Sequence, residues 1–300
     1  MGKVWKLGTR GSALARTQSG HVADALAALT GDAVELVVIR TRGDAITDRP
    51  LAQVGGKGLF TKEIEDALLE GAVDLAVHSF KDLPSESPAG LVVAGLPPRE
   101  DPRDSLVGAP LAALREGAVV GTGSARRRLQ LLAARPDLRV VDLRGNVDTR
   151  VRKVRDGELD AAVLAAAGLA RLGRSADVAE ALAVDVMVPA VAQGVLAVQT
   201  REDHAPMRDA LARLTDPDTA TCVALERAFL EALGGGCSVP AACHAWIDGD
   251  AVAYAAFLGR DDGAAVAERG RCARADGVAV GASLGRRLAA TLAAHAAPRR

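Results

Sequence analysis

The sequence predicts an α/β protein with two similar lobes and a smaller α+β domain at the C-terminal end. Apolar, β-branched runs alternate with helical segments over the first two thirds of the chain, which is typical of βαβ units built on a largely parallel sheet. A strand followed by a Gly/Thr/Ser turn and a helix occurs twice, at 7–12 and 119–124. From residue 216 onward the pattern changes to a helix, two hairpin turns and a final helix.

The first lobe is expected to comprise 1–97 and 195–215. Its first helix should begin after the N-cap Ser12 and stop at Gly31, and its second should begin at Thr61 and end at Gly71. The expected strands are Val4–Leu7, Val34–Ile39, Val73–His78 and Val195–Gln199.

Residues 98–194 form the expected second lobe. Its segment Asp156–Val163 repeats the order of glycine, aspartate and buried strand found at Glu70–Val77. Prolines around Pro97-Pro98 mark the first crossing between the lobes, and the second is predicted near Pro189–Gly194. The two lobes are therefore joined by two crossings.

The third domain is expected to span 216–300. Asp216 followed by Pro217 predicts a helix start. Gly-containing turns at Asp248-Gly249 and Asp262-Gly263 predict hairpins between short strands, and an Ala/Leu helix should close the chain near Gly277–His295.

Composition restricts the class of protein. The 300 residues include 49% hydrophobic and 25% charged residues with a net charge of −1, as in globular domains. Near-neutral charge and 2% aromatic residues argue against a nucleic-acid binder, although Arg126–Arg128 raises that alternative. The N-terminal residues read as neither a signal peptide nor a membrane span, and the cysteines lack metal-ligand spacing. We expect a cytoplasmic protein without a metal.

Both lobes place basic residues at a predicted helix start, where backbone N–H groups favour anions. The first turn carries Arg10 and Ser12; the second carries Ser124, Arg126 and Arg127, with Arg128 expected to point elsewhere. Taken singly, further arginines such as those at 144, 150 and 171 would be surface residues. If the lobes face each other, the set predicts a cleft for a ligand with several negative charges.

Two other segments carry candidate chemistry. The glycine-rich stretch Val54–Phe60 is not a phosphate loop, because Gly58 stands where Ser or Thr should follow Lys57. It is interpreted either as a loop that brings Lys57 and Phe60 over the cleft or as a plain surface loop. His78–Pro84 follows a buried strand, so its Lys-Asp pair is either an ion pair or a group that stabilises a developing cation.

Cys237 lies in Gly234–Pro240, directly after a strongly helical run. The three preceding glycines remove side chains from around one thiol, as expected for a cysteine that carries a large group. The alternative is a helix C-cap with a buried thiol.

In order and spacing, these segments resemble the porphobilinogen deaminase (hydroxymethylbilane synthase) family along essentially the whole chain. The matching stretches are Thr9–Ser12, Thr41–Asp44, Val54–Phe60, Ala76–Asp82, Arg99–Asp104, Gly121–Arg127, Leu143–Val147 and Gly235–Pro240.

The resemblance implies a monomeric transferase of tetrapyrrole and haem biosynthesis. Such an enzyme joins four porphobilinogen units head to tail with loss of ammonia and releases hydroxymethylbilane by hydrolysis. The chain grows on a dipyrromethane cofactor attached through a thioether to the cysteine that matches Cys237, and Asp82 matches the catalytic carboxylate. The implied cofactor-binding residues are Ser79, Lys81, Asp82, Thr122, Ser124, Arg126, Arg127, Arg144, Gly145 and Cys237. The implied substrate-binding residues are Arg10, Ser12, Lys57, Phe60, Arg150 and Arg171.

Three positions depart from the family pattern. Gln53 replaces a lysine, Gly123 replaces a serine and Ala192 replaces a glycine. The principal alternative is a non-catalytic anion receptor, because two βα lobes joined by two crossings also describe periplasmic binding proteins. That alternative leaves the third domain and Cys237 unexplained.

Overall fold

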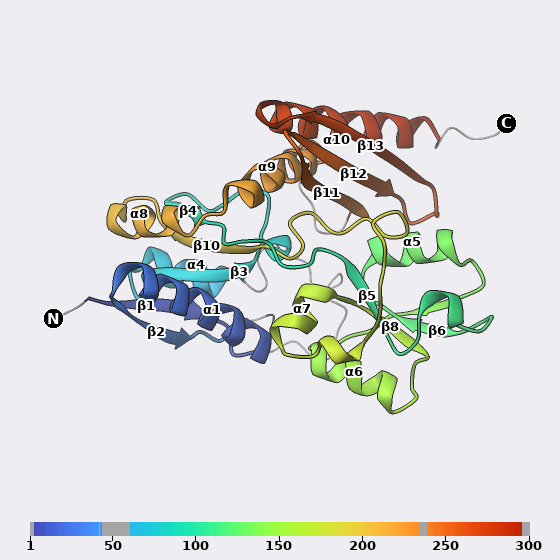
Figure 1. Cartoon of the computed structure of the whole chain (residues 1–300), viewed down its shortest axis with the longest axis horizontal. Helices are drawn as coiled ribbons and strands as arrows, with labels where there is room; N and C mark the ends of the chain where they lie inside the picture. The colour runs from blue at the N-terminus through green and yellow to red at the C-terminus, as the bar shows by residue number, and fades with distance from the viewer. Residues whose placement is uncertain (1–2, 42, 44–60, 235–238, 296–300) are drawn as a thin grey trace. The chain divides into compact units, whose positions relative to one another are not determined.

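A computed structural model describes residues 3–41, 43, 61–234 and 239–295 (Figure 1). The chain divides into two compact units. The first consists of Met1–Arg99 and Val195–Ala220, and the second of Glu100–Gly194 and Thr221–Arg300. The division into three domains that the sequence suggests stays a prediction.

The first unit is built on a mixed five-stranded sheet. Its strands, in spatial order, are β2 (Ala33–Val38), β1 (Val4–Thr9), β3 (Leu75–Ser79), β10 (Leu196–Arg201) and β4 (Leu91–Gly95). β1 pairs in parallel with β2 and β3, whereas β10 runs antiparallel to β3 and β4. Four of the five strands therefore run in the same direction, as expected for a largely parallel sheet, and β10, which follows the second crossing, is the antiparallel exception.

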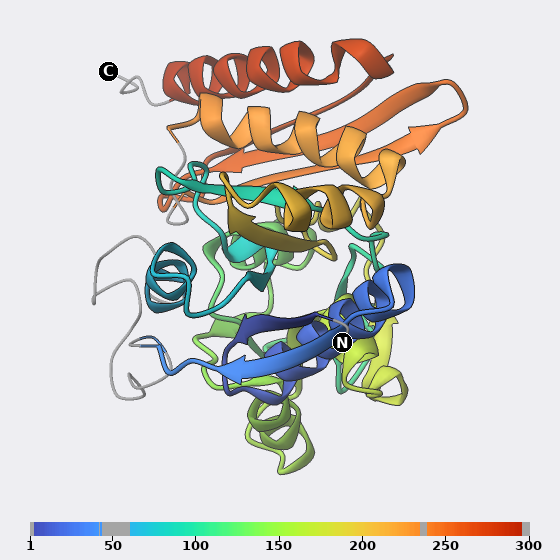
Figure 2. The ribbon, with the colours of Figure 1, turned by 90° about the vertical axis from the view of Figure 1, so that its left-hand side faces the viewer.

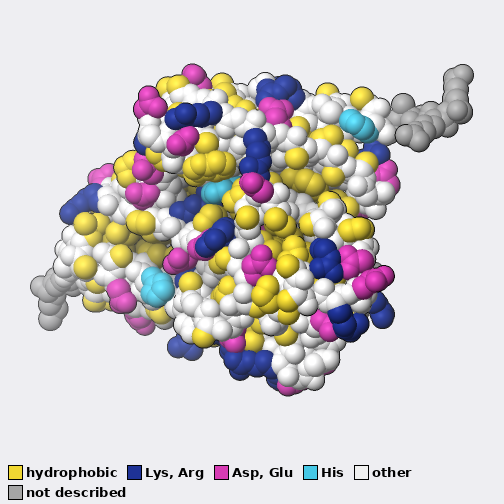
Figure 3. All heavy atoms as spheres, turned by 45° about the vertical axis from the view of Figure 1, so that its right-hand side comes forward, with side chains coloured by type: hydrophobic (Ala, Val, Ile, Leu, Met, Phe, Trp, Pro, Cys, Tyr) yellow, Lys and Arg dark blue, Asp and Glu magenta, His cyan; other side chains and the backbone are white. Residues whose placement is uncertain are grey.

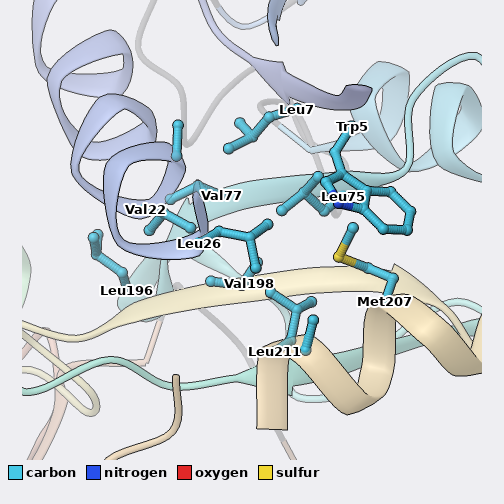
Figure 4. Packing of buried hydrophobic residues seen from close by; sticks show 12 residues of the cluster. Trp5, Leu7, Val22, Leu26, Leu75, Val77, Leu196, Val198, Met207 and Leu211 are labelled. Carbon is cyan, nitrogen blue, oxygen red and sulfur yellow. The ribbon is translucent and has the colours of Figure 1, made fainter. Parts of the chain in front are cut away.

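Helices cover both faces of this sheet. The helices are α1 (Ala13–Thr30), α4 (Lys62–Leu69) and α8 (Ala205–Arg213). α1 and α8 pack on one face, where Leu26, Leu75 and Val198 are buried and Met207 lies beside Trp5 (Figure 4). α4 contributes its apolar residues to a separate cluster on the other face, with Val73 and Ala76 of the β3 region. The alternation of side chains along β3 explains why both faces are apolar.

The local end signals were predicted with one error. Ser12 caps α1, since its Oγ accepts the Ala15 N–H at 3.3 Å, and Gly31 ends that helix at φ 77°. Thr61 precedes α4 as expected but makes no side-chain cap bond. Its hydroxyl lies 3.3 Å from Oε2 of Glu65 instead, so it donates to the helix's own carboxylate.

The second unit contains a five-stranded sheet with the same pattern of pairing. In spatial order its strands are β7 (Arg139–Val141), β6 (Val119–Gly121), β8 (Ala161–Ala165), β5 (Asp104–Val107) and β9 (Val178–Ala181). β6 pairs in parallel with β7 and β8, and β5 runs antiparallel to β8 and β9. The associated helices are α5 (Ala125–Ala134), α6 (Val147–Arg155) and α7 (Ala166–Arg171).

The two copies of the internal repeat contain the same backbone hydrogen bond to an aspartate. Asp74 accepts the Lys6 N–H at 2.9 Å, and Asp160 accepts the Val119 N–H at 2.7 Å. In each case the aspartate stands just before a central strand, β3 or β8, and accepts from the neighbouring parallel strand, β1 or β6. The glycine three residues earlier has φ 72° at Gly71 and 75° at Gly157. The repeated glycine and aspartate therefore perform the same backbone function twice.

The C-terminal part of the second unit is an α+β layer. Its antiparallel strands are β11 (Ala241–Asp248), β12 (Ala251–Gly259) and β13 (Ala265–Ala273). Its helices are α10 (Gly277–Ala294) and α9 (Pro217–Ala232), of which the part from Thr221 onward belongs to the second unit. The predicted start of α9 is confirmed, because Asp216 accepts the Thr219 N–H at 2.7 Å. The predicted hairpin glycines Gly249 and Gly263 have φ of 64° and 92°. Short 3₁₀ turns complete the structure at Phe80–Asp82 (η1), Leu111–Ala113, Ser175–Asp177 and Arg274–Asp276.

Helices α9 and α10 approach each other through glycine (Figure 2). A Cβ added at Gly281 would lie 2.2 Å from the carbonyl oxygen of Leu225, and one at Gly285 would lie 2.6 Å from that of Phe229. Only glycine leaves room for this contact between backbones. The small residues of α10 thus determine how closely it packs on the helix that leads to Cys237.

We predict that Gly281→Ala lowers the free energy of unfolding by about 1–3 kcal/mol, because the new methyl group overpacks a backbone contact. Gly277→Ala is the matched control, since its Cβ would meet Leu225 Cβ at an ordinary 3.6 Å. The control should be neutral or slightly stabilising. Urea denaturation followed by circular dichroism compares the two, and equal stabilities would contradict the prediction.

Candidate active site

The predicted Ser79–Asp82 site lies at the carboxyl end of β3. The Phe80 N–H donates to the Val195 carbonyl at 3.0 Å, and the Leu83 N–H closes the η1 turn on the Phe80 carbonyl at 3.1 Å. Phe80 and Leu83 are buried, whereas Asp82 is exposed and Lys81 half-buried. The turn is thus anchored on both sides while the Asp82 carboxylate remains accessible.

The first basic turn lies at the same edge of the sheet. β1 and β3 are parallel neighbours, with Gly8 opposite Ala76, so their carboxyl ends fall together. Arg10 and Ser12 follow β1, and both are half-buried. Nε2 of Gln18 on α1 donates to Oγ of Ser79 at 3.0 Å, which connects the helix to the end of β3. The structure therefore brings these two predicted groups to one edge.

His78 lies beneath this edge, on the α4 side of the sheet. Burial lowers the pKa of its imidazole to about 4; a hydrogen bond with Gln199 opposes the shift, and the nearby Arg10 charge adds to it. Among the described residues, Nε2 of His78 and Oε1 of Gln199 are buried polar atoms without a hydrogen bond of good geometry. His78 is consequently neutral at neutral pH and adds no positive charge beside Ser79.

The second basic turn is organised by its hydroxyl groups. Thr122, which follows β6, is buried, and its Oγ1 accepts the Ser124 N–H at 3.2 Å. Ser124 caps α5, with Oγ 3.4 Å from the Arg127 amide nitrogen. Gly123 fits this turn closely, because a Cβ there would lie 3.0 Å from the Leu143 carbonyl oxygen. Glycine avoids this close contact, whereas the family's usual serine would place its Cβ there.

Arg126 and Arg127 are buried and not open to solvent, at 6% and 7% exposure. Asp104, at the start of β5, lies 2.7 Å from a guanidinium nitrogen of each. Burial alone would raise the pKa of Asp104, but the two guanidinium groups hold it well below its usual range. One carboxylate thus neutralises only one of two buried cations, and the cluster keeps a net positive charge.

Arg128 behaves differently, as expected. Its guanidinium reaches outward to the Val140 carbonyl and to Asp142, at 2.7 and 3.3 Å. Arg126 and Arg128 are two positions apart and lie on nearly opposite sides of α5, so both cannot reach Asp104.

The remaining predicted arginines follow the neighbouring strands of the second sheet. Nε of Arg150 donates to the Gly145 carbonyl at 2.8 Å, and Gly145 has φ 102°. Arg144, in the same turn, is exposed. Nη2 of Arg171, at the end of α7, donates to the Gly194 carbonyl at 2.6 Å. Burial lowers the pKa of Arg171, and Glu100 opposes that shift.

Some predicted groups lie outside the described residues: Lys57, Phe60, Gln53 and Cys237. That the edges of the two lobes line a common cleft stays a prediction, as do the individual roles of the site residues.

Three fully buried polar residues are absent from the predicted site: Asp104, Gln193 and Glu226. Asp104 could have been found as a lone carboxylate that enters an apolar strand in a chain with an Arg-Arg-Arg run. Glu226 could have been found as the acidic residue within the apolar pattern of α9.

No helix within the described part of the chain has the length and apolarity to cross a bilayer. On the face shown in Figure 3, basic and acidic side chains are interspersed.

The structure thus describes an α/β protein with buried cations at one strand edge and an anchored, exposed carboxylate at another, and buried cations beside a helix N-terminus favour anionic ligands. The chain matches two family profiles, "Porphobilinogen deaminase, dipyromethane cofactor binding domain" over residues 5–209 and "Porphobilinogen deaminase, C-terminal domain" over residues 220–293. The chain belongs to the porphobilinogen deaminase family. The prediction from its motifs is confirmed, including the transferase activity and the dipyrromethane cofactor.

Curated relatives are similar over nearly their whole length. The porphobilinogen deaminase of Syntrophotalea carbinolica is 48% identical over 98% of this chain and 94% of its own. That of Roseiflexus sp. is 50% identical over 93% of both chains, and that of Paracoccus denitrificans is 49% identical over 94% and 93%.

Solved structures are more distant. The BvgS periplasmic VFT2 domain of Bordetella pertussis is 17% identical over 70% of this chain and 86% of its own, with a TM-score of 0.41. The periplasmic aliphatic sulphonate binding protein SsuA of Escherichia coli is 13% identical over 77% and 70%, with a TM-score of 0.38. The predicted fold class of two α/β lobes with a small α+β part is confirmed.

We predict that His78 makes folding stability fall in mild acid. Its pKa is about 4 in the folded protein and 6.5 ordinarily, so between these values the unfolded chain binds the proton and the folded chain does not. Stability should therefore fall by about 3 kcal/mol as the pH drops from 6.5 to 4. His78→Gln should remove this part of the pH dependence, measured by urea denaturation at a series of pH values.

The matched control is His21→Gln, because His21 is exposed on α1. It should leave the pH dependence unchanged. If His78→Gln and the control give the same curve as the unsubstituted protein, His78 does not cause the effect.

Proposed function

We propose that this chain makes hydroxymethylbilane with Asp82 and Cys237 as its catalytic residues. The reaction is the stepwise, head-to-tail condensation of four porphobilinogen units with loss of ammonia on a dipyrromethane cofactor, followed by hydrolytic release. The observation that carries this function is the pair of family matches, which together span residues 5–209 and 220–293. The geometry of the described residues supports the individual roles.

The charge of the second lobe fits the cofactor. Each of its two pyrroles bears carboxylates, and the Arg126–Arg127 pair keeps one positive charge that Asp104 does not neutralise. A residual buried cation beside the α5 N-terminus favours an anionic group there. Ser124, Thr122 and the Arg144-Gly145 turn belong to the same sheet edge and complete the proposed binding set, with Ser79 and Lys81 in the first lobe. When bound through Cys237, the cofactor supplies the pyrrole carbon to which the first substrate is joined.

Asp82 is proposed to stabilise the cation that forms when porphobilinogen loses ammonia. Its carboxylate stands on a turn that is anchored by buried neighbours, so little reorganisation is needed as charge develops. The same carboxylate can accept hydrogen bonds from pyrrole N–H groups and so orient two neighbouring rings. Lys81 beside it can hold a substrate carboxylate.

The substrate-binding residues are proposed to hold the acetate and propionate groups of porphobilinogen and of the growing chain. This set consists of Arg10, Ser12, Lys57, Phe60, Arg150 and Arg171. Arginine suits this task because its planar fork can bind a carboxylate through two N–H groups. Phe60 offers a ring against which a pyrrole can stack.

We also propose that the enzyme works as a cytoplasmic monomer without nucleic-acid or membrane partners. The free, half-buried thiol of Cys272 suits a reducing compartment. The mixed signs of charge in Figure 3 and the net charge of −1 do not favour binding to polyanions.

Cys237→Ala should abolish covalent attachment of the cofactor, because no other atom replaces the sulfur nucleophile. Intact-mass spectrometry of the purified protein should then show the mass of the bare chain, whereas the unsubstituted protein should carry two additional pyrrole units. Cys272→Ala is the control, since Cys272 is a half-buried thiol of β13. Normal turnover by Cys237→Ala would refute the attachment.

Asp82→Asn should keep the fold and the attached cofactor but lower the rate of ammonia release by about two to three orders of magnitude. The physical reason is the loss of the negative charge opposite the developing cation. Glu86→Gln, an exposed change four residues later, is the control. If Asp82→Asn retains most of its activity, Asp82 is only structural.

A further inference from the structure

Glu226 is a buried carboxylate that joins two distant backbone segments to α9. Its side chain is 0% exposed. Oε2 accepts the Ala192 N–H at 2.6 Å, and Oε1 accepts the Ala245 N–H at 2.7 Å. His244 Nδ1 lies 3.5 Å from Oε1. Such short contacts are typical of an ionised acceptor, so Glu226 binds the second crossing and β11 to the helix that leads to Cys237.

The residue that Glu226 holds is conformationally unusual. Ala192 has φ 56° and is the one non-glycine residue, within the described ranges, that adopts a positive φ. A Cβ disfavours this left-handed conformation, and the family's usual residue here is glycine. The bond from the Ala192 N–H to Glu226 offsets that preference, and the Gln193 N–H closes the turn on the Ala190 carbonyl at 2.9 Å.

The next residue carries the connection into the arginine cluster. Gln193 Nε2 donates to Asp104 Oδ1 at 3.0 Å and to the Pro102 carbonyl at 2.7 Å. Asp104 in turn pairs with Arg126 and Arg127. At the other end of the segment, Nη1 of Arg126 donates to the Val188 carbonyl at 2.7 Å.

Arg126 is therefore bonded to the segment 188–194 at both ends, directly at Val188 and through Asp104 at Gln193. A shift of Ala192 out of its left-handed conformation would move Gln193 and with it the carboxylate that orients both arginines. The path from Glu226 to Arg126 contains only buried groups and lies within the second unit.

We propose that Glu226 is a positioning residue: it holds Ala192 in the left-handed conformation and thereby sets Arg126 and Arg127 relative to α9. Because residue 192 is alanine here, its left-handed conformation depends more strongly on Glu226 than it would in a chain with the family's usual glycine at this position. This inference rests on the proposed function, in which the arginines bind anionic groups and α9 leads to the cysteine that bears the cofactor. Glu226 thus fixes the position of the two arginines relative to α9 without contacting the substrate.

The test is a double-substitution experiment on the full-length protein carrying its cofactor. Glu226→Gln should lower kcat/KM at least tenfold, because an amide can accept one N–H but places a donor against the other. Adding Ala192→Gly should restore kcat/KM at least threefold, since glycine reaches φ 56° without a Cβ. Ala192→Gly alone should be within twofold of the unsubstituted protein, as should the control Glu231→Gln, an exposed change on the same helix.

A second readout does not depend on activity. Hydrogen exchange at the Ala192 amide should become at least tenfold faster in Glu226→Gln and stay unchanged in Glu231→Gln. A purely stabilising Glu226 would give independent effects of the two substitutions on kcat/KM, with no rescue by glycine; that result overturns the proposal.

A third variant covers the case in which Glu226→Gln does not fold. Gln193→Met keeps the side-chain length but removes the amide that reaches Asp104. It should lower kcat/KM at least fivefold while the Ala192 amide remains protected. Unchanged kcat/KM in this variant also overturns the proposal.

Discussion

The burial of two guanidinium groups against one carboxylate is the constraint on which the second unit depends. Charged groups leave water only when bonded on all sides, because the cost of desolvation is several kcal/mol per ion. Asp104 therefore needs Arg126, Arg127 and the Gln193 amide together. This requirement brings the start of β5, the first turn of α5 and the second crossing to one place, although they are far apart in sequence.

The burial of two guanidinium groups against one carboxylate also gives the second lobe a local positive charge. The cluster keeps one uncompensated positive charge next to a helix N-terminus, in a protein whose net charge is −1. An anionic group bound there would complete the charge balance, which is the basis for the proposed binding of a cofactor that carries carboxylates. The first lobe uses the opposite arrangement: the backbone around Asp82 is anchored by buried residues, while the carboxylate itself stays accessible.

The two lobes have the same sheet topology but carry different side chains at the ends of their strands. Asp74 and Asp160 make equivalent bonds at the start of equivalent strands, and the two sheets have the same order of parallel and antiparallel pairs. The differences lie at the carboxyl ends of the strands, where loops can vary without disturbing the sheet. One lobe presents an acid there, and the other presents buried cations.

Patterns in the amino-acid sequence were enough to predict the α/β alternation, the internal repeat, the Ser12 and Asp216 caps and the hairpin glycines. These features depend on neighbours within a few residues, so local propensity and periodicity are enough to predict them. The family motifs also indicated most of the candidate site. Three features became known only from the folded chain: β10 runs antiparallel, Arg126 and Arg127 are buried against Asp104, and Glu226 accepts the Ala192 N–H. The arginines lie at least 22 positions from Asp104 in the sequence, and Glu226 lies 34 positions from Ala192. Contacts over such separations are set by the packing of whole elements and not by local sequence.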